Sequence, residues 1–302
     1  MFYDVIVVGG GPAGLSAALY ASRARLKTLL IEKNGCGGQM AITDLLENYP
    51  GFNEGINGFD LAVKLEKQVR DFGAKIVYDE VVSIEHGHVK KVITVNATYE
   101  TRTIIIAAGT RVKEMNIPGE LKFMGKGVSF CATCDAPFYR DKDILVVGGG
   151  DSAIKEAIYL SKFAKNVTIV HRRNELKATK ILQERLSLYL NISVMYDTVL
   201  KEIFGEDSIE KVTVTNIKTN KNKDLKVSGV FVFIGSIPNS LFLFDITLDE
   251  VGYVITDENM NTSISGIFAC GDIRKKQLRQ VITAASDGAQ AAVSAQHYIE
   301  NL

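Results

Sequence analysis

The stretch VVGGGPAG, from Val7 to Gly14, is followed 139 residues later by VVGGGDSA, from Val146 to Ala153. The same offset relates Leu30-Ile31-Glu32 to Ile169-Val170-His171. Self-similarity at a fixed offset is typical of a chain that uses one structural unit more than once. The sequence therefore predicts two copies of a unit that begins with a glycine-rich turn.

Each copy predicts a strand, a helix and a second strand. Residues 3–8 form a short apolar run with β-branched side chains, as in a buried parallel strand. Residues 12–23 are rich in Ala and Leu and predict a helix, and residues 27–31 predict the next strand. The second copy predicts strands at 144–147 and 166–170 with a helix at 152–163. Parallel strands joined through a helix indicate an α/β fold.

The rest of the chain completes this architecture without a third glycine turn. Residues 262–269 predict a strand and residues 284–300 predict a helix, which we expect to return to the first domain. The predicted fold class is α/β, with two Rossmann-like three-layer dinucleotide-binding domains, the second inserted into the first. The expected boundaries are 1–116 and 246–302 for the first, discontinuous domain and 117–245 for the second. This placement rests partly on the family resemblance given below.

Composition and charge argue against several classes of protein. Lys plus Arg number 35 and Asp plus Glu number 35, so the formal net charge is zero, which argues against a nucleic-acid or membrane-surface partner. No cationic segment precedes the first apolar residues, and no run of about 18 apolar residues exists, so neither a signal peptide nor a spanning helix is predicted. We expect a cytoplasmic protein, where thiols stay reduced and a close cysteine pair is catalytic or metal-binding.

The first glycine turn has the pattern of a dinucleotide site. In Gly9-x-Gly11-x-x-Gly14 the first glycine permits the tight turn, the second lets the backbone approach a pyrophosphate, and the third lets helix and strand pack closely. The N-terminus of the following helix presents free N–H groups to the phosphates. Glu32 ends the second strand, 18 residues after Gly14, where a carboxylate accepts hydrogen bonds from an adenosine ribose. The first site is predicted to hold FAD or NAD.

The second glycine turn carries cations where the first carries an acid. His171 stands at the position that matches Glu32, and two arginines and a lysine follow it. A carboxylate there would repel a 2′-phosphate, whereas guanidinium groups pair with one, so this site is predicted to hold NADP. The residues expected at this site are Gly148, Gly150, Asp151, Ser152, Ala153, His171, Arg172, Arg173 and Lys177.

A cysteine pair lies just before the second glycine turn, in Cys131-Ala132-Thr133-Cys134-Asp135. Two residues between the cysteines permit a small, reversible disulfide, and in such pairs the pKa of one thiol is commonly lowered. Asp135 adjoins the pair and could carry a proton to the departing thiolate.

The alternative interpretation of this pair is half of a zinc site. Tetrahedral zinc needs four ligands, but Cys36 and Cys270 are isolated in the sequence and no histidine has a suitable Cys/His spacing. His86 and His88 fall in a predicted surface hairpin. We therefore predict no metal, and we interpret Cys36 and Cys270 as ordinary small residues.

Two dinucleotide turns with a CxxC between them resemble the low-molecular-weight, bacterial and archaeal-type NADPH-dependent thioredoxin reductases, over essentially the whole chain. Residues 37–40 (GGQM), 47–51 (ENYPG), 107–110 (AAGT), 271–274 (GDIR) and 278–281 (LRQV) resemble FAD-contact segments of the family, and residues 233–239 (FIGSIPN) resemble the segment that closes the NADPH domain. The resemblance implies FAD contacts at Gly9, Gly11, Pro12, Ala13, Gly14, Glu32, Gly38, Gln39, Asn48, Ala108, Gly109, Gly271, Asp272, Arg279, Gln280 and Val281, and adds Ile234 and Gly235 to the NADPH contacts.

The resemblance also implies a reaction. A homodimeric flavoprotein would pass electrons from NADPH to FAD and then, through Cys134, to the Cys131–Cys134 disulfide. Cys131 would attack the disulfide of thioredoxin or a thioredoxin-like protein, with Asp135 as the acid–base residue. Because the cysteine pair and the NADPH site lie on one inserted domain and both must reach the flavin, we expect domain rotation, with hinges near Asn116–Pro118 and Leu241–Asp245.

Two alternatives stay open. The same scaffold could serve a glutaredoxin-like or other thioredoxin-like partner, or take electrons from a donor other than NADPH. A ferredoxin-fed enzyme is expected to lack the second glycine motif and its arginine pair, and both are present here. From another class, a non-catalytic flavin-binding redox sensor would use the cysteine pair to switch conformation without turnover.

Overall fold

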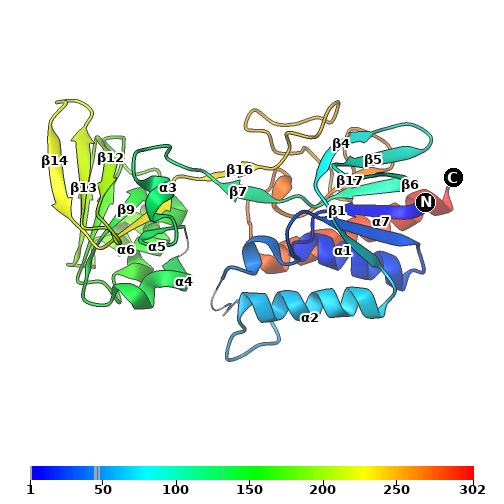
Figure 1. The fold of residues 1–302 in the computed structure, drawn as a ribbon, viewed down its shortest axis with the longest axis horizontal. Coiled ribbons are helices and arrows are strands. Elements are labelled where there is room, and N and C mark those ends of the chain that lie inside the picture. The colour runs from blue at the N-terminus through cyan, green and yellow to red at the C-terminus, as the bar shows by residue number, and fades with distance from the viewer. Residues whose placement is uncertain (1, 44–45, 47, 131) are drawn as a thin grey trace. The chain divides into compact units, whose positions relative to one another are not determined.

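The computed structural model describes residues 2–43, 46, 48–130 and 132–302. It divides into two compact units (Figure 1), which we call the first and second units. The first unit consists of Met1–Arg111 and Ile237–Leu302, and the second of Val112–Ser236. The first unit is therefore discontinuous in sequence. The divisions fall after residues 111 and 236, whereas the expected boundaries lie after 116 and 245.

Packing explains the difference at the second boundary. Leu243 and Ile246 are buried in a core cluster of the first unit. The Asn239 side chain donates a hydrogen bond of 2.8 Å to the carbonyl of Ala108, also in the first unit. Residues 237–245 thus belong to the first unit, and the segment 233–239 that was expected to close the NADPH domain is divided between the two units after Ser236.

The segment expected to contain one hinge is anchored within the second unit. The carboxylate of Glu120, which is only 2% exposed, accepts hydrogen bonds from the backbone N–H of Met115 at 2.9 Å and of Asn116 at 2.7 Å. The chain instead crosses between the units in β7 (Thr110–Val112) and β16 (Ser236–Pro238), which pair with each other.

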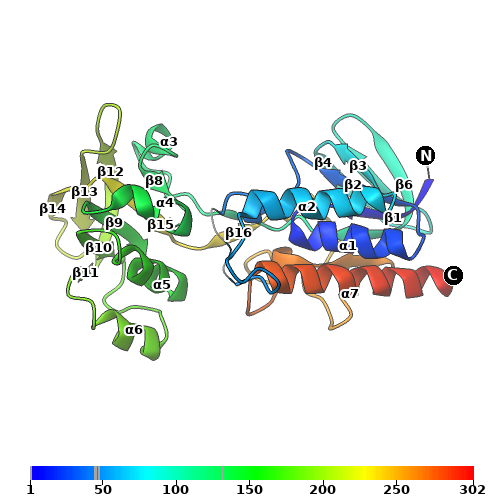
Figure 2. The same ribbon diagram turned by 90° about the horizontal axis from the view of Figure 1, so that it is seen from below.

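The first unit is built on a seven-stranded sheet in the order β3-β2-β1-β6-β5-β4, with β17 also paired to β6. Strands β1, β2, β3, β6 and β17 run parallel, and β4, β5 and β6 pair antiparallel. The helices α1, α2 and α7 lie side by side (Figure 2). The elements are β1 (Phe2–Val8), α1 (Pro12–Arg23), β2 (Thr28–Glu32), η1 (Gly38–Met40), α2 (Gly58–Asp71), β3 (Lys75–Tyr78), β4 (Val81–Glu85), β5 (Lys90–Thr94), β6 (Thr98–Ile106), β17 (Ile267–Ala269), η3 (Gly271–Ile273) and α7 (Val281–Glu300).

The second unit contains a parallel five-stranded sheet in the order β11-β10-β9-β15-β8 and an antiparallel three-stranded sheet, β12-β13-β14. No helix of the described residues is both long and apolar enough to cross a membrane. The elements are α3 (Glu120–Phe123), β8 (Val128–Ser129), α4 (Ala132–Asp135), η2 (Ala136–Tyr139), β9 (Asp143–Gly148), α5 (Asp151–Leu160), β10 (Asn166–Val170), α6 (Lys180–Leu186), β11 (Ile192–Met195), β12 (Thr198–Phe204), β13 (Lys211–Asn216), β14 (Asn222–Lys226) and β15 (Gly229–Phe233).

The two glycine units share one strand register. Val5 pairs with Thr28 in the first unit, and Ile144 pairs with Val167 in the second. Both residues of the second pair lie 139 positions after those of the first, so the repeat in the sequence is a repeat in the structure. The predicted α/β fold class is confirmed. Helix α1 covers residues 12–23 as predicted, but the strand expected at 262–269 forms only at Ile267–Ala269.

Helix α7 presses directly on the helix that follows the first glycine turn. An added Cβ on Gly288 would lie 2.9 Å from the carbonyl carbon of Ala13 and 3.0 Å from the amide nitrogen of Ala17. The absence of a side chain at Gly288 therefore lets the backbones of α7 and α1 approach each other. This contact fixes the first turn of α1, where the candidate site lies.

We expect Gly288→Ala to destabilise the protein by roughly 1–3 kcal/mol, because the added methyl group would collide with the backbone of α1. Alanine has the higher helix propensity, so propensity alone would predict the opposite sign. Urea unfolding followed by circular dichroism measures the change. Gly35→Ala is the matched control, since Gly35 is exposed and an added Cβ there meets nothing within 4 Å. Equal stability of the two variants would contradict the contact.

Candidate active site

The first glycine turn leaves an open surface at the N-terminus of α1. Gly9 has a φ of +104°, and an added Cβ would lie 2.5 Å from the carbonyl oxygen of Ala107. An added Cβ on Gly11, in contrast, meets no described atom within 4 Å. Helix α1 begins at Pro12 without a hydrogen bond from an N-cap side chain. The early N–H groups of α1 therefore face open space, as a phosphate site requires.

Glu32 is held at the edge of this turn. One carboxylate oxygen accepts a hydrogen bond of 2.6 Å from the backbone N–H of Gly10, and the other accepts one of 3.1 Å from that of Asn34. Glu32 lines a pocket of about 500 Å³ together with residues 8–9, 31–34, 79–82 and 238–239, among others. The sequence placed this carboxylate correctly at the end of the second strand, and the structure adds its fixed orientation.

Two segments that are distant in sequence meet the glycine turn. The backbone N–H of Gly37 donates to the carbonyl of Gly10 at 2.8 Å, and an added Cβ on Gly38 would lie 3.3 Å from the Cα of Gly11. An added Cβ on Gly271 would lie 2.7 Å from the Cβ of Ala13. The fold thus brings residues from three of the predicted FAD-contact segments together around the start of α1.

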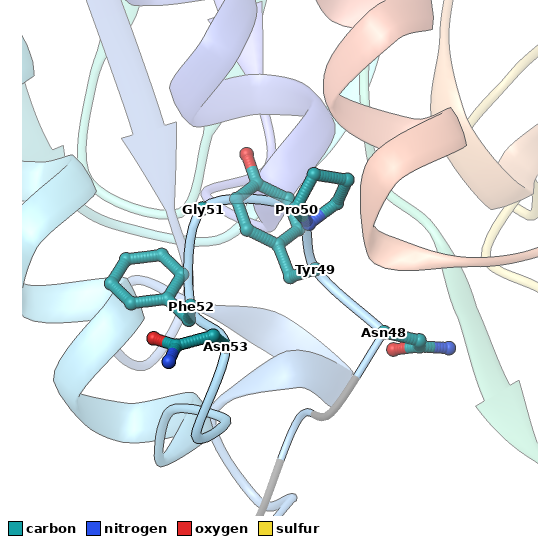
Figure 3. Close-up of a pocket in the computed structure, with 6 residues that line it drawn as sticks. All are labelled: Asn48, Tyr49, Pro50, Gly51, Phe52 and Asn53. Carbon is teal, nitrogen blue, oxygen red and sulfur yellow. The ribbon is translucent and has the colours of Figure 1, made fainter.

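Further predicted residues are joined by hydrogen bonds. The Asn48 amide donates to the Gln280 side chain at 3.0 Å, and Gln280 caps α7, whose first residue is Val281. The Gln39 amide donates to the carbonyl of Thr110 at 3.5 Å, next to Gly109. Asn48 also begins the loop 48–53, which lines a pocket of about 480 Å³ (Figure 3).

Two predicted residues carry buried polar atoms that have no hydrogen-bond partner among the described residues. These atoms are one carboxylate oxygen of Asp272 and the Nε of Arg279. Burial raises the pKa of Asp272, against the opposing charges of Lys276 and Arg279. The Arg279 guanidinium also stacks 4.2 Å from the ring centroid of Tyr253. One unsatisfied acceptor and one unsatisfied donor fit a polar ligand beside η3.

Sequence reasoning missed the residue that anchors this region. Asp287, on α7, accepts hydrogen bonds from the Gly271 N–H at 3.1 Å and from Lys276 Nζ at 2.8 Å, and its other oxygen lies 3.3 Å from Arg274. Its side chain is only 13% exposed. A single acidic residue within the small and apolar stretch 281–293 was the available signal.

The second glycine turn repeats the first in its backbone. Gly148 has a φ of +151°, and an added Cβ would lie 2.7 Å from the Cβ of Ala153. An added Cβ on Gly150 meets no described atom within 4 Å, and α5 begins at Asp151 without a hydrogen bond from an N-cap side chain. Ser152 is exposed in the first turn of α5. This turn also has the open face that a phosphate requires.

His171 occupies the position that Glu32 occupies in the first unit. Glu32 packs against Gly10, and the His171 ring packs against Gly149, which lies 139 residues after Gly10. His171 is 8% exposed, and its Nε2 has no partner among the described residues. Burial lowers the pKa of His171, and the charges of Arg173, Arg172 and Lys177 lower it further. The ring is therefore neutral at pH 7.

The three cations that follow His171 are free to bind an anion. Arg172, Arg173 and Lys177 are exposed, and within the described chain none of them forms an ion pair with a carboxylate. Ile234 and Gly235 lie just beyond β15, and Gly235 has a φ of +110° with open space where a Cβ would stand. The second unit thus combines an open glycine turn with uncompensated positive charge.

The cysteine pair lies on the second unit. Cys131 is outside the described residues, as are the side chains of Thr133 and Cys134. Helix α4 (Ala132–Asp135) packs on α5, since Ala132 and Ala153 share one buried cluster. Asp135 ends α4 and is partly exposed. Burial raises the pKa of Tyr139, and the charge of Asp135 raises it further.

The profile of the pyridine nucleotide-disulphide oxidoreductase family matches residues 3–288. The chain belongs to this family. It is 46% identical to a thioredoxin reductase of Treponema pallidum over 99% of this chain and 98% of the relative. It is 45% identical to one of Bacillus subtilis over 99% and 96%. The crystal structure of Lactococcus lactis thioredoxin reductase superposes with a TM-score of 0.84 at 44% identity, covering 99% of this chain and 100% of that one. The predicted resemblance and oxidoreductase class are confirmed.

The other two cysteines of this family member have unreactive thiols. Burial, followed by the charges of Glu66 and Glu32, raises the pKa of Cys36 to about 12. Burial also strongly raises the pKa of Cys270. Among the described residues, no three His, Cys, Asp or Glu side chains come together in a way that could hold a metal ion.

We expect Cys36 to resist alkylation. At pH 8 a thiol of pKa about 12 is roughly one part in 10⁴ thiolate, so iodoacetamide should react on the order of 1,000-fold more slowly than with a free cysteine. The measurement uses mass spectrometry on Cys131→Ser/Cys134→Ser, which leaves only Cys36 and Cys270. Adding Glu66→Gln should accelerate labelling. Labelling at the rate of a free thiol would show that burial does not protect Cys36.

We expect Asp272→Asn to stabilise the ligand-free protein at pH 7 by roughly 1 kcal/mol or more. The folded-state pKa of Asp272 is raised, so its contribution to stability is present below an unfolded pKa of about 4 and is lost as the pH rises through the folded pKa. Asparagine stays neutral, so the advantage of the variant should vanish toward pH 4. Thermal unfolding from pH 4 to pH 8 measures it.

The matched control is Asp257→Asn. Burial raises the pKa of Asp257, but hydrogen bonds from Asn261 and Asn259 lower it more, so the net shift has the opposite sign. This variant should lose stability at pH 7. A loss of stability in both variants would contradict the assignment of an unsatisfied carboxylate at Asp272.

Proposed function

We propose that this chain is an NADPH-dependent thioredoxin-disulfide reductase that uses FAD. The observation that carries the proposal is the contrast between two superimposable glycine turns. The first has Glu32 at its edge, and the second has three unpaired cations. The sequence places a CxxC pair on the same unit as the cationic site. The relatives in Treponema pallidum and Bacillus subtilis, which are named thioredoxin reductases, support the substrate class.

The first unit would hold FAD. The open turn at Gly9–Gly14 would bind the pyrophosphate through backbone N–H groups, and Glu32 would accept hydrogen bonds from the adenosine ribose through its remaining lone pairs. The unsatisfied oxygen of Asp272 and Nε of Arg279 would bind the polar part of the flavin. The same site would include Gly38, Gln39, Asn48, Ala108, Gly109, Gly271, Gln280 and Val281, together with Pro12 and Ala13.

The second unit would hold NADPH. Arg172, Arg173 and Lys177 would pair with the 2′-phosphate, and the open turn at Gly148–Gly150 would bind the pyrophosphate. A lysine at 177 gives a point charge without the bidentate fork of an arginine. His171 would pack beneath the turn, and Ser152, Ala153, Ile234 and Gly235 would complete the site.

Bound FAD would supply the conversion of a hydride into two electrons for disulfide reduction. Cys134 would accept these electrons on the flavin side, which opens the Cys131–Cys134 disulfide to two thiols. The Cys131 thiolate would then attack the disulfide of thioredoxin, forming a mixed disulfide and releasing one thiolate of the partner. Attack of Cys134 on Cys131 would release the second. Asp135 would transfer a proton to the departing sulfur.

The proposed partner is thioredoxin or a thioredoxin-like protein. We propose a homodimer, by resemblance to the family. We propose the cytoplasm as its location, because a reversible cysteine pair works where thiols are kept reduced.

An anaerobic titration of the flavin-loaded protein tests the proposal. We expect NADPH to bleach the flavin absorbance at a concentration roughly tenfold or more below that needed with NADH, because only NADPH carries the 2′-phosphate. Sluggish bleaching by both would contradict the proposed donor and favour ferredoxin or another reductant.

Cys134→Ser is the matched control for this titration. The variant should keep FAD and its bleaching by NADPH but lose reduction of a thioredoxin disulfide. Loss of FAD would contradict the role assigned to Cys134.

A further inference from the structure

We infer that Asp151 is a positioning residue that sets the preference of the second site for a 2′-phosphate, by holding the cation-bearing segment 172–178 against the glycine turn. The inference rests on the proposed function and concerns the same site. It changes the role of Asp151, which the sequence analysis placed among the residues that contact the cofactor.

The side chain of Asp151 turns toward the end of the cationic segment. Asp151 is the first residue of α5, directly after Gly150. Its Oδ1 accepts a hydrogen bond of 2.7 Å from the backbone N–H of Thr179, which precedes α6. A carboxylate at a helix N-terminus would compete with a bound phosphate for the same N–H groups. The bond to Thr179 gives this carboxylate a different partner.

Backbone bonds complete the attachment. The N–H groups of Lys177 and Ala178 both donate to the carbonyl of Gly149, at 2.8 and 3.1 Å. The Gln183 amide donates to the carbonyl of Ala178 at 2.7 Å. Asp151 supplies the side-chain part of this attachment, and it does so from the residue next to the open Gly150.

The geometry matters because a dinucleotide bridges the two anion sites. Its pyrophosphate and 2′-phosphate are separated by a fixed covalent framework, so both can bind well only when the cations are held at a matching distance from the turn. Arg172, Arg173 and Lys177 are exposed on long side chains and cannot set that distance themselves. Loss of the Asp151–Thr179 bond should therefore weaken NADP⁺, which uses both sites, more than NAD⁺, which uses one.

The test is isothermal titration calorimetry of NADP⁺ and NAD⁺ on the full-length, flavin-loaded protein. Asp151→Ala should weaken NADP⁺ binding about tenfold, the worth of one hydrogen bond to a charged group, and change NAD⁺ binding much less. Asp151→Asn keeps the acceptor oxygen and should keep the ratio of the two dissociation constants. Asp207→Ala removes the same charge from an exposed loop of the second unit and should change neither.

A second variant removes the donor in place of the acceptor. Thr179 has a φ of −57°, which proline can adopt, so Thr179→Pro deletes the N–H while retaining that angle. It should lower the ratio as Asp151→Ala does, and the double variant should add little to either, as expected for two halves of one bond. Melting temperatures identify any variant that fails to fold.

Two results would overturn the inference. One is an unchanged NADP⁺ to NAD⁺ ratio in Asp151→Ala, whether neither affinity moves or both weaken equally. The other is full additivity of Asp151→Ala and Thr179→Pro. These differ from failure of the proposed function, in which the unmodified protein itself would not prefer NADP⁺, and which would overturn the inference as well.

Discussion

The close passage of one backbone over another at residue 9 constrains the rest of the first unit. Gly9 crosses the end of β6, where the carbonyl of Ala107 leaves no room for a side chain. The chain can turn there only with a positive φ, and α1 then begins at the carboxyl edge of the parallel strands. Gly148 crosses the end of β15 in the same way, against the carbonyl of Phe233. Ligands of open parallel sheets bind at this edge, so the steric constraint locates both sites.

The two copies show how one backbone can bind two different ligands. Gly10 and Gly149 are equivalent, and each has the side chain that ends the second strand packed against it. In the first unit that side chain is the Glu32 carboxylate, fixed by the N–H of Gly10. In the second it is the His171 ring, whose pKa is lowered by burial and by nearby cations. Since the register of the strands is shared, the change in preference comes from charge at one position and from the segment that follows it.

Local chemistry was predictable from the sequence, and long-range attachment was not. The strands, α1 and the positions of Glu32 and His171 follow from periodicity, glycine spacing and a repeat, all of which are readable over about 30 residues. The functions of Asp287, Glu120 and Asn239 depend on partners up to 131 residues away, such as the carbonyl of Ala108. A lone acid or amide in a sequence does not name its partner. The expected domain boundaries were displaced for the same reason, because burial of Leu243 in the first unit is a tertiary fact.

The anchors on either side of the crossing strands bear on the proposed catalytic cycle, which requires the two units to change their arrangement. On one side, Glu120 fixes the backbone of Met115 and Asn116 within the second unit. On the other, the side chain of Asn239 fixes the return segment to Ala108 in the first unit. Backbone torsion between these anchors is left to residues 111–114 and 235–238, which include most of β7 and β16. A hinge of so few residues can absorb a large rotation while both cores stay intact, since neither anchor has to break.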